Sequence, residues 1–357
     1  MQWVWRGAGG PHRATPPDRV TRPAALPTVG VVHRERAVAA WESLERACLR
    51  TDRTGVSLRE PAHGLHRSRP SNAWPLSQVL HATALLRAIG VPAPFQPLLA
   101  TLRRYRSGDG YSAAPGGGPR YYDDNAWLGL AALQGGQVEL ARSVLGFVEQ
   151  GWTPGGGVRW REDLRSVHAC STGAAGLLAM AAGPLASGAV ERAERALGFL
   201  EGPLRRPDGL VADHVDADGR LEPTVWSYNQ GLTIGLHVEL AARTRPPGDL
   251  GRARELADAT LRHFGADDGL WRQPVAFNAV LLRLLLRLHA ADGDPRWPQV
   301  VDDYLERAWA SARDPETGLF LGGGIGRYDD GVALDQAGLL QLFALRVMPP
   351  QQWATVR

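Results

Sequence analysis

The segment STGAAGLLAMAA at residues 171–182 has no charged residue and places small or apolar side chains on every face of a helix. Three further segments are predominantly small or apolar in the same way: GLAALQ at 129–134, NQGLTIGLHVEL at 229–240 and FNAVLLRLLLRL at 277–288. A helix that is apolar nearly all round is buried, so these segments predict inner helices. Segments with one charged face, such as ERAVAAWESLERACLR at 35–50, alternate with them and predict surface helices.

The helical period of the apolar residues predicts twelve helices, at 33–50, 74–89, 94–107, 123–135, 137–150, 170–183, 185–201, 226–243, 250–264, 275–292, 297–313 and 334–347. Every second helix is an inner one, which gives a repeat of about 50 residues. Six pairs of one surface and one inner helix predict an all-α fold, an (α/α)6 barrel, with an open helical solenoid as the alternative. We expect one barrel domain over residues 31–350 and a disordered leader over residues 1–30.

Long Gly-, Pro- and Trp-containing segments precede the inner helices, whereas short turns follow them. The long segments therefore meet at one rim of the barrel, together with the N-termini of the inner helices. Helix N-termini present free N–H groups and partial positive charge, and long loops on a rigid scaffold often carry the functional site. The sequence predicts a site at this rim.

The composition excludes several classes of function. All 40 basic residues other than histidine are arginines, so no lysine is present for a Schiff base or for a nucleotide phosphate loop. The arginines are balanced by 37 acidic residues and form no dense basic run, so we expect no nucleic-acid partner.

Two cysteines, Cys48 and Cys170, are too few for a structural Cys/His zinc site, and we expect neither a metal nor a cofactor. A disulfide between them is possible in principle, and a reduced state fits equally well. No segment is apolar enough to span a membrane, and residues 1–30 contain no apolar core of a secretory signal. These features predict a cytoplasmic protein without a membrane partner.

The segment YYDDNAW at 121–127 places Asp123 and Asp124 at the start of a predicted inner helix. Repulsion between neighbouring carboxylates raises the pKa of one, while the helix-terminal N–H groups favour ionisation of the other. Glycoside hydrolysis requires such a split between an acid and an anion. Because consecutive Cα atoms are about 3.8 Å apart, carboxyl groups near 5 Å are feasible, and that spacing favours retention. The alternative is a helix cap without catalytic function.

YYDDNAW also resembles the catalytic signature of glycoside hydrolase family 76, the endo-α-1,6-mannanases and related proteins, which have an (α/α)6 barrel. The segments GGGVRWRED at 155–163, PDGLVADHV at 207–215 and WSYNQG at 226–231 are similar to further parts of the family, in the same order along the chain. The chain departs from the family pattern after Phe277, where Asn278 and Ala279 stand in place of a Lys-Gly pair.

The resemblance implies a retaining hydrolase of α-linked mannosides, with Asp123 as nucleophile and Asp124 as general acid/base. It implies an oligo- or polysaccharide substrate that is bound by Trp74, Tyr122, Asn125, Asp213, Tyr228, Asn229 and Gln230. Helix capping is the alternative role for Asn229, and a turn the alternative for Asp213. A non-hydrolytic glycan-binding relative and another α/α-toroid enzyme, such as a lanthionine cyclase or a sugar epimerase, are the alternative functions.

Further residues near the expected rim have both a functional and a structural interpretation. Trp74, Trp127, Trp152, Trp160, Trp226 and Trp271 have flat rings that suit sugar faces, although each could equally be part of the core. His168 and Cys170 could form half of a metal site, but no second cysteine lies near them in the sequence. A helix-start histidine with its hydrogen bonds satisfied is the favoured interpretation.

Overall fold

The computed structural model describes residues 29–53, 55–61, 68–183, 187–243, 248–328 and 331–356. The first helix, α1 (Val29–Cys48), begins two residues before the end of the expected leader, so residues 29–30 are helical. Residues 1–28, where the rest of that expectation falls, lie outside the described residues.

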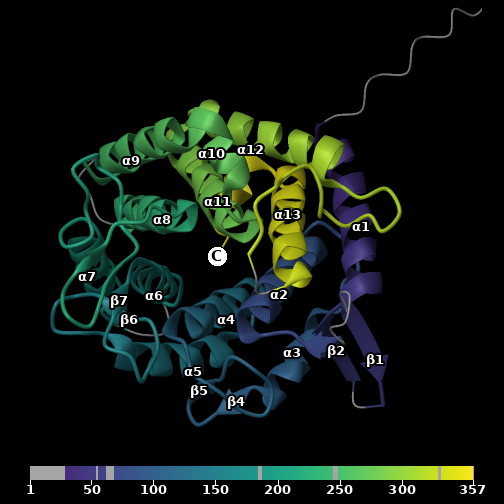
Figure 1. Ribbon diagram of the computed structural model, residues 1–357, viewed down its shortest axis with the longest axis horizontal. Helices are drawn as coiled ribbons and strands as arrows, with labels where there is room; N and C mark the ends of the chain where they lie inside the picture. Colours follow the sequence, from purple (N-terminus) through teal and green to yellow (C-terminus); the bar gives the residue numbers. More distant parts are fainter. Residues whose placement is uncertain are drawn as a thin grey trace, which may run out of the picture.

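Six inner helices form a closed ring around the centre of the molecule (Figure 1). In chain order they are α2 (Ala73–Ala88), α4 (Tyr122–Gln134), α6 (Ala169–Ala181), α8 (Ser227–Arg243), α11 (Val275–Asp292) and α13 (Val332–Val347). Each packs against the next, and α13 packs against α2, so the ring has no open end. The closed ring excludes the open solenoid.

The outer layer follows the ring and covers it from outside (Figure 1). It consists of α1, α3 (Phe95–Ala100), α5 (Val138–Val148), α7 (Ala189–Leu200), α9 (Gly248–Gly265) and α12 (Arg296–Arg307). Two single-turn helices, α10 (Gly269–Arg272) and α14 (Pro350–Trp353), were not expected from the sequence. The alternation of inner and outer helices agrees with the alternation of apolar and charged segments.

Small residues allow the inner helices to pack closely. All 13 residues of α6 are buried, as the uncharged segment at 171–182 predicts. Gly173 in α6 faces Leu232 in α8, and Gly235 in α8 faces Leu284 in α11. At Gly231 the α11 backbone itself is close, because a Cβ there would lie 2.6 Å from the Leu281 Cα. Only glycine fits at that position, which explains the G in NQG.

Short antiparallel strands occupy the long segments that precede the inner helices. β1 (Leu49–Asp52), β2 (Gly55–Glu60) and β3 (Arg69–Pro70) precede α2; β4 (Arg106–Ser107) and β5 (Gly110–Tyr111) precede α4. β6 (Val158–Arg159), β7 (Val167–His168), β8 (His214–Val215) and β9 (Leu221–Glu222) form one sheet that joins the segments before α6 and α8. The expected rim of long segments is therefore partly ordered by sheet pairing.

The helix expected at 94–107 is shorter in the structure. α3 ends at Ala100, a 3-10 turn covers Thr101–Arg104, and the chain then enters the β4–β5 hairpin. Gly108 has a φ of +60° in that hairpin, a conformation that the helical period of the neighbouring residues does not reveal. The local turn thus prevails over the apolar pattern.

The structure bears on two questions that the sequence raised, a disulfide bond and a membrane-spanning helix. Cys48 and Cys170 are both buried free thiols, so they form no disulfide. Within the described ranges, none of the helices combines the length and the apolar character that a membrane span requires.

Candidate active site

A cavity of about 500 Å³ opens at the rim where the inner helices begin. Its walls come from five of the inner helices, α2, α4, α6, α8 and α11, and from the segments that precede α2, α4, α6, α8 and α13. The lining residues are Asn72, Trp74, Ala113, Tyr121, Asp123, Asp124, Trp127, Trp160, His168, Cys170, Asp213, His214, Trp226, Tyr228, Phe277 and Tyr328. Three carboxylates and no arginine are among these residues, so the lining is acidic.

The second residue of an inner helix repeatedly faces this cavity. Trp74 is the second residue of α2, Asp123 of α4, Cys170 of α6 and Tyr228 of α8, and all four line it. The four helices converge on the cavity with equivalent orientation. The ring geometry therefore gathers side chains that lie up to 154 residues apart in the sequence (228 − 74).

Both carboxylate oxygens of Asp123 accept hydrogen bonds. The Asp124 backbone N–H donates to Oδ1 at 3.1 Å, and the Cys170 thiol donates to Oδ2 at 3.3 Å. Burial raises the pKa of Asp123 to about 6, since it removes water from the charged form; the hydrogen bond from Cys170 lowers the pKa against this effect. Asp124 lines the same cavity and is half-buried.

A third carboxylate, Asp213, lines the same cavity and stands immediately before β8. His214 Nδ1 is 2.9 Å from its Oδ2, and Asn229 Nδ2 donates to its Oδ1 at 3.2 Å. Asn229 itself is fully buried and does not line the cavity. Its amide therefore holds the Asp213 carboxylate in place.

Two groups of aromatic rings face the carboxylates. On one side Tyr121, Trp160, His168 and His214 form a row, with centroid distances of 4.9, 5.0 and 4.2 Å between successive rings. On the other side Phe277 contacts Trp74, Trp226, Tyr228 and Tyr328, and its ring stacks on Tyr228 at 4.0 Å. Flat apolar rings on both walls suit a ligand with apolar faces and polar edges, such as a sugar ring.

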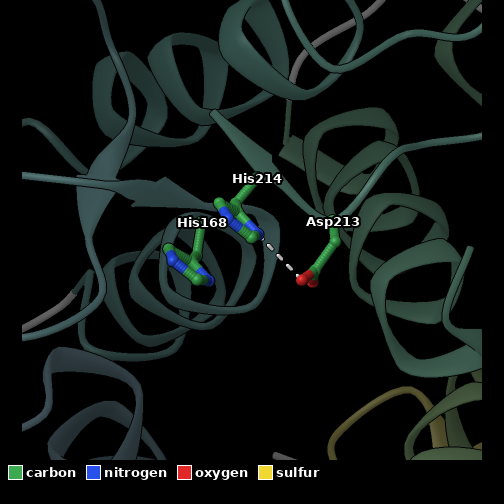
Figure 2. A group of neighbouring side chains, drawn as sticks. All are labelled: His168, Asp213 and His214. Atoms are coloured by element: carbon green, nitrogen blue, oxygen red, sulfur yellow. Dashed lines mark hydrogen bonds and ion pairs between the residues drawn. The ribbon is translucent and has the colours of Figure 1, made fainter. Parts of the chain in front are cut away.

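His168, Asp213 and His214 have the ligand types of a transition-metal site, and their ligand atoms lie within 4.8 Å of one another (Figure 2). The two imidazole rings, however, are parallel to within 4° and stacked. An imidazole nitrogen binds a metal in the plane of its own ring, and two separate parallel planes share no point. One ion therefore does not fit both histidines in this arrangement, which is instead a ring stack beside an Asp–His pair.

The two histidines of this stack differ in surroundings. His168 is 9% exposed, and its Nε2 lies 3.0 Å from the Ser166 hydroxyl. Burial, followed by the nearby His214, lowers the pKa of His168 to about 3. His168 is thus neutral at ordinary pH, whereas His214 lies at the exposed end of the row against a carboxylate.

Besides Asn229, three residues that the sequence suggests for substrate binding lie outside the cavity lining. Asn125 accepts from the Tyr111 N–H and donates to the Tyr111 and Tyr121 carbonyls. Gln230 pairs in the same way with the backbone N–H and carbonyl of Val211. Both are fully buried and hold the preceding segment against the helix.

Tyr122 is the third such residue, and it is 2% exposed. Its ring stacks on Phe147 at 5.0 Å, and Arg159 donates to its hydroxyl. Among the tryptophans expected near the rim, Trp152 and Trp271 also lie outside the cavity lining, whereas the other four line it. The expected binding residues that do reach the cavity are Trp74, Asp213 and Tyr228.

The sequence suggested no substrate-binding role for several residues that the structure places in the lining, notably Cys170, His214, Phe277 and Tyr328. The sequence contains one usable signal for His214, because it directly follows Asp213. Phe277 and Tyr328 carry no such signal, since they belong to an apolar helix and to a Gly-rich segment.

Residues 70–311, more than half of the chain, match the family model described as glycosyl hydrolase family 76. The chain belongs to glycoside hydrolase family 76. This membership confirms the resemblance seen in YYDDNAW and the expectation that the protein is a glycoside hydrolase. A search of curated proteins finds no match to the sequence.

Solved structures of family 76 proteins share the fold. A family 76 glycoside hydrolase from a bovine Bacteroides thetaiotaomicron strain has a TM-score of 0.76 at 23% identity, over 88% of this chain and 77% of that one. A family 76 mannosidase from Bacteroides thetaiotaomicron has a TM-score of 0.74 at 20% identity, over 88% and 98% of the two chains. An inactive variant of a Salegentibacter α-1,6-mannanase, with two adjacent aspartates changed to asparagine and α-1,6-mannotriose bound, has a TM-score of 0.71 at 20% identity, over 88% and 99%. These matches confirm the (α/α)6 barrel.

Proposed function

We propose that this family 76 member is a retaining hydrolase of α-1,6-linked mannosides, and that Asp123 and Asp124 perform the reaction. The observation that carries the proposal is the adjacent carboxylate pair at the start of α4, which faces a cavity with aromatic walls. The Salegentibacter α-1,6-mannanase supports it, because a variant with two adjacent aspartates changed is described as inactive.

The hydrogen bonds of Asp123 favour the role of nucleophile. A general acid needs a proton on one oxygen and must donate it, whereas both oxygens of Asp123 accept hydrogen bonds. The two hydrogen bonds therefore stabilise the ionised form of Asp123. Burial raises the pH above which Asp123 is ionised. With a pKa raised to about 6, Asp123 is ionised above that pH.

In the proposed reaction the Asp123 carboxylate attacks the anomeric carbon while the glycosidic C–O bond breaks. Asp124 gives its proton to the leaving oxygen, and a glycosyl ester of Asp123 forms. Asp124, now ionised, takes a proton from water, whose oxygen attacks the anomeric carbon and releases Asp123. Two displacements return the sugar with its original α configuration.

The remaining lining residues account for binding of a neutral sugar. Asp213, held by His214 and Asn229, has further acceptor capacity for hydroxyl groups. Trp74 and Tyr228 offer ring faces on the opposite wall. The absence of arginine from the described lining, together with three carboxylates, disfavours substrates that carry acidic groups.

The test is a turnover assay on α-1,6-, α-1,2- and α-1,3-manno-oligosaccharides, with α-1,4-gluco-oligosaccharides for comparison and the product anomer followed by proton NMR. We expect hydrolysis of the α-1,6-mannosides with the α anomer appearing first, and no hydrolysis by the Asp124→Asn variant. The β anomer appearing first would refute retention. Calorimetric binding of the saccharides without turnover would instead identify a non-hydrolytic glycan-binding protein.

A further inference from the structure

Cys170 is the second residue of α6 and lies at the bottom of the cavity, 2% exposed. Its sulfur is 3.3 Å from Asp123 Oδ2, within the range of a hydrogen bond to sulfur. The two residues come from neighbouring inner helices and are 47 positions apart in the sequence. This contact between a thiol and a carboxylate of the proposed reaction has no role in the chemistry described above.

The thiol is held in its protonated, donating form. Burial raises the pKa of Cys170 well above its ordinary value, and the negative charges of Asp123 and Asp213 add to this effect. Tyr228, the second residue of α8, is close enough to lower the pKa of the thiol against these effects. Burial and the neighbouring acidic groups also raise the pKa of Tyr228.

We propose that Cys170 is a positioning residue for the hydrolysis proposed above: its S–H fixes the Asp123 carboxylate and helps to make Asp123, rather than Asp124, the nucleophile. The inference rests on the proposed function. Two donors from different directions, the thiol and the Asp124 backbone N–H, restrict rotation of the carboxylate. A thiol is a weak donor, so it orients the carboxylate without binding it tightly.

The effect of the Cys170 thiol on the pKa of Asp123 has to be separated from the effects of the other titratable groups around Asp123. They are Asp124 on its own helix, Tyr121 directly before that helix, His168 on β7, Asp213 directly before β8, His214 on β8, Tyr228 on α8 and Tyr328 before α13. No charged side chain from α2 appears among the described lining residues. Trp160 is a further donor that lowers the pKa of Asp123. Among the donors that lower this pKa, Cys170 has the largest effect.

The experiment compares Cys170→Ala, which removes the donor, with Cys170→Ser, which keeps one, and measures kcat/KM against pH on an α-1,6-mannoside. Loss of the donor destabilises the ionised carboxylate, so we expect the acidic limb of Cys170→Ala to move up by about one pH unit. The rate then falls about fivefold at pH 6 and little at pH 8. Cys170→Ser restores the position of the limb, since a hydroxyl donates from nearly the same place.

Cys48→Ala is the matched control, because Cys48 is also a buried free thiol but does not line the cavity. Its acidic limb is expected to stay where the wild-type limb is. Cys170→Ala with an unshifted limb overturns the proposal. So does Cys170→Ser with the same shift as Cys170→Ala, since that result indicates loss of packing rather than loss of a donor.

A second readout does not depend on turnover. The carboxyl carbons of 13C-labelled aspartate report ionisation by NMR, and comparison with Asp123→Asn assigns the Asp123 signal. We expect that signal to titrate at higher pH in Cys170→Ala than in the wild-type protein and in Cys170→Ser. If the wild-type protein hydrolyses no mannoside, the proposed function fails while this titration still decides whether Cys170 controls Asp123; an unchanged titration refutes it.

Discussion

The start of α4 and the start of α8 have the same backbone arrangement and different chemistry. In each, the second residue faces the cavity: Asp123 in α4 and Tyr228 in α8. In each, the fourth residue holds the backbone of the preceding segment: Asn125 and Gln230. Two positions along a helix correspond to a rotation of about 200°, so the two side chains point to nearly opposite sides. The function of a residue at such a helix start is thus set by its position in the first turn.

The rule extends to other inner helices. Thr172, fourth in α6, accepts from the Val158 N–H and donates to the His168 carbonyl. Asn278, fourth in α11, donates to the Leu270 carbonyl. In α13 the fourth residue is Asp335, and the next residue, Gln336, pairs with the backbone of Phe320 instead.

The largest expected effect is the difference in kcat/KM between variants at the second residue of α4 and at the second residue of α8. Asp123→Asn removes the proposed nucleophile, so we expect kcat/KM on an α-1,6-mannoside to fall by about 10³-fold or more. Tyr228→Phe keeps the ring that stacks on Phe277 and loses one hydroxyl, and we expect a fall of about threefold. Steady-state kinetics on the two variants test this, with circular dichroism as a control for folding. Equal losses would show that the two second positions do not differ in role.

Substitutions of the fourth residues of α4 and α8 are expected to change the free energy of unfolding rather than the reaction. Asn125→Ala and Gln230→Ala each leave a buried backbone N–H and carbonyl without their partners, at a cost of about 3 kcal/mol in the free energy of unfolding. Urea unfolding measures the loss, and Thr355→Ala, which removes an exposed hydroxyl, is the control expected to change little. Undiminished stability together with a raised KM would instead support the direct binding role that the sequence suggests.

Asp335 affects stability in a way that depends on pH. Burial raises its pKa to about 7, and the Arg327 Nε lies 3.5 Å from its Oδ2. Because the folded-state pKa is raised, the stabilising effect of the protonated carboxyl is complete below its ordinary pKa of 3.8 and is lost as the pH rises through 7.

Asp335→Asn has no such dependence. We therefore expect the variant to gain about 4 kcal/mol relative to the wild-type protein between pH 4 and pH 8. Urea unfolding at the two pH values measures this difference. Asp218→Asn, at an exposed aspartate, is the control and should differ from wild type by the same amount at both pH values. A gain for Asp335→Asn that is already present at pH 4 would contradict the titration.

The proposed catalytic pair, Asp123 and Asp124, could be found from the sequence because both residues stand in one short segment that precedes an apolar helix. The directions in which the neighbouring side chains point could not be predicted from the sequence. The predicted helix starts were 123 and 226, whereas the structure has Tyr122 and Ser227. Consecutive side chains on a helix point about 100° apart. When a helix start is known only to within a residue or two, the sequence does not decide which side chains face the cavity. Asn125 and Gln230, which the family resemblance suggests for substrate binding, hold the backbone of the preceding segments in the structure.

The sequence by itself determined the pairs of inner and outer helices, since the alternation of apolar and charged helices with a period of about 50 residues leaves few other ways to bury those surfaces. The packing of α13 against α2 decided between a closed ring and an open solenoid. The sequence also determined the rim and the aspartate pair, which depend on residues close together in the chain. Only the tertiary structure brought Cys170 to Asp123 and stacked His214 on His168. These contacts join separate repeats, and their geometry depends on how the helices pack, which no local pattern encodes.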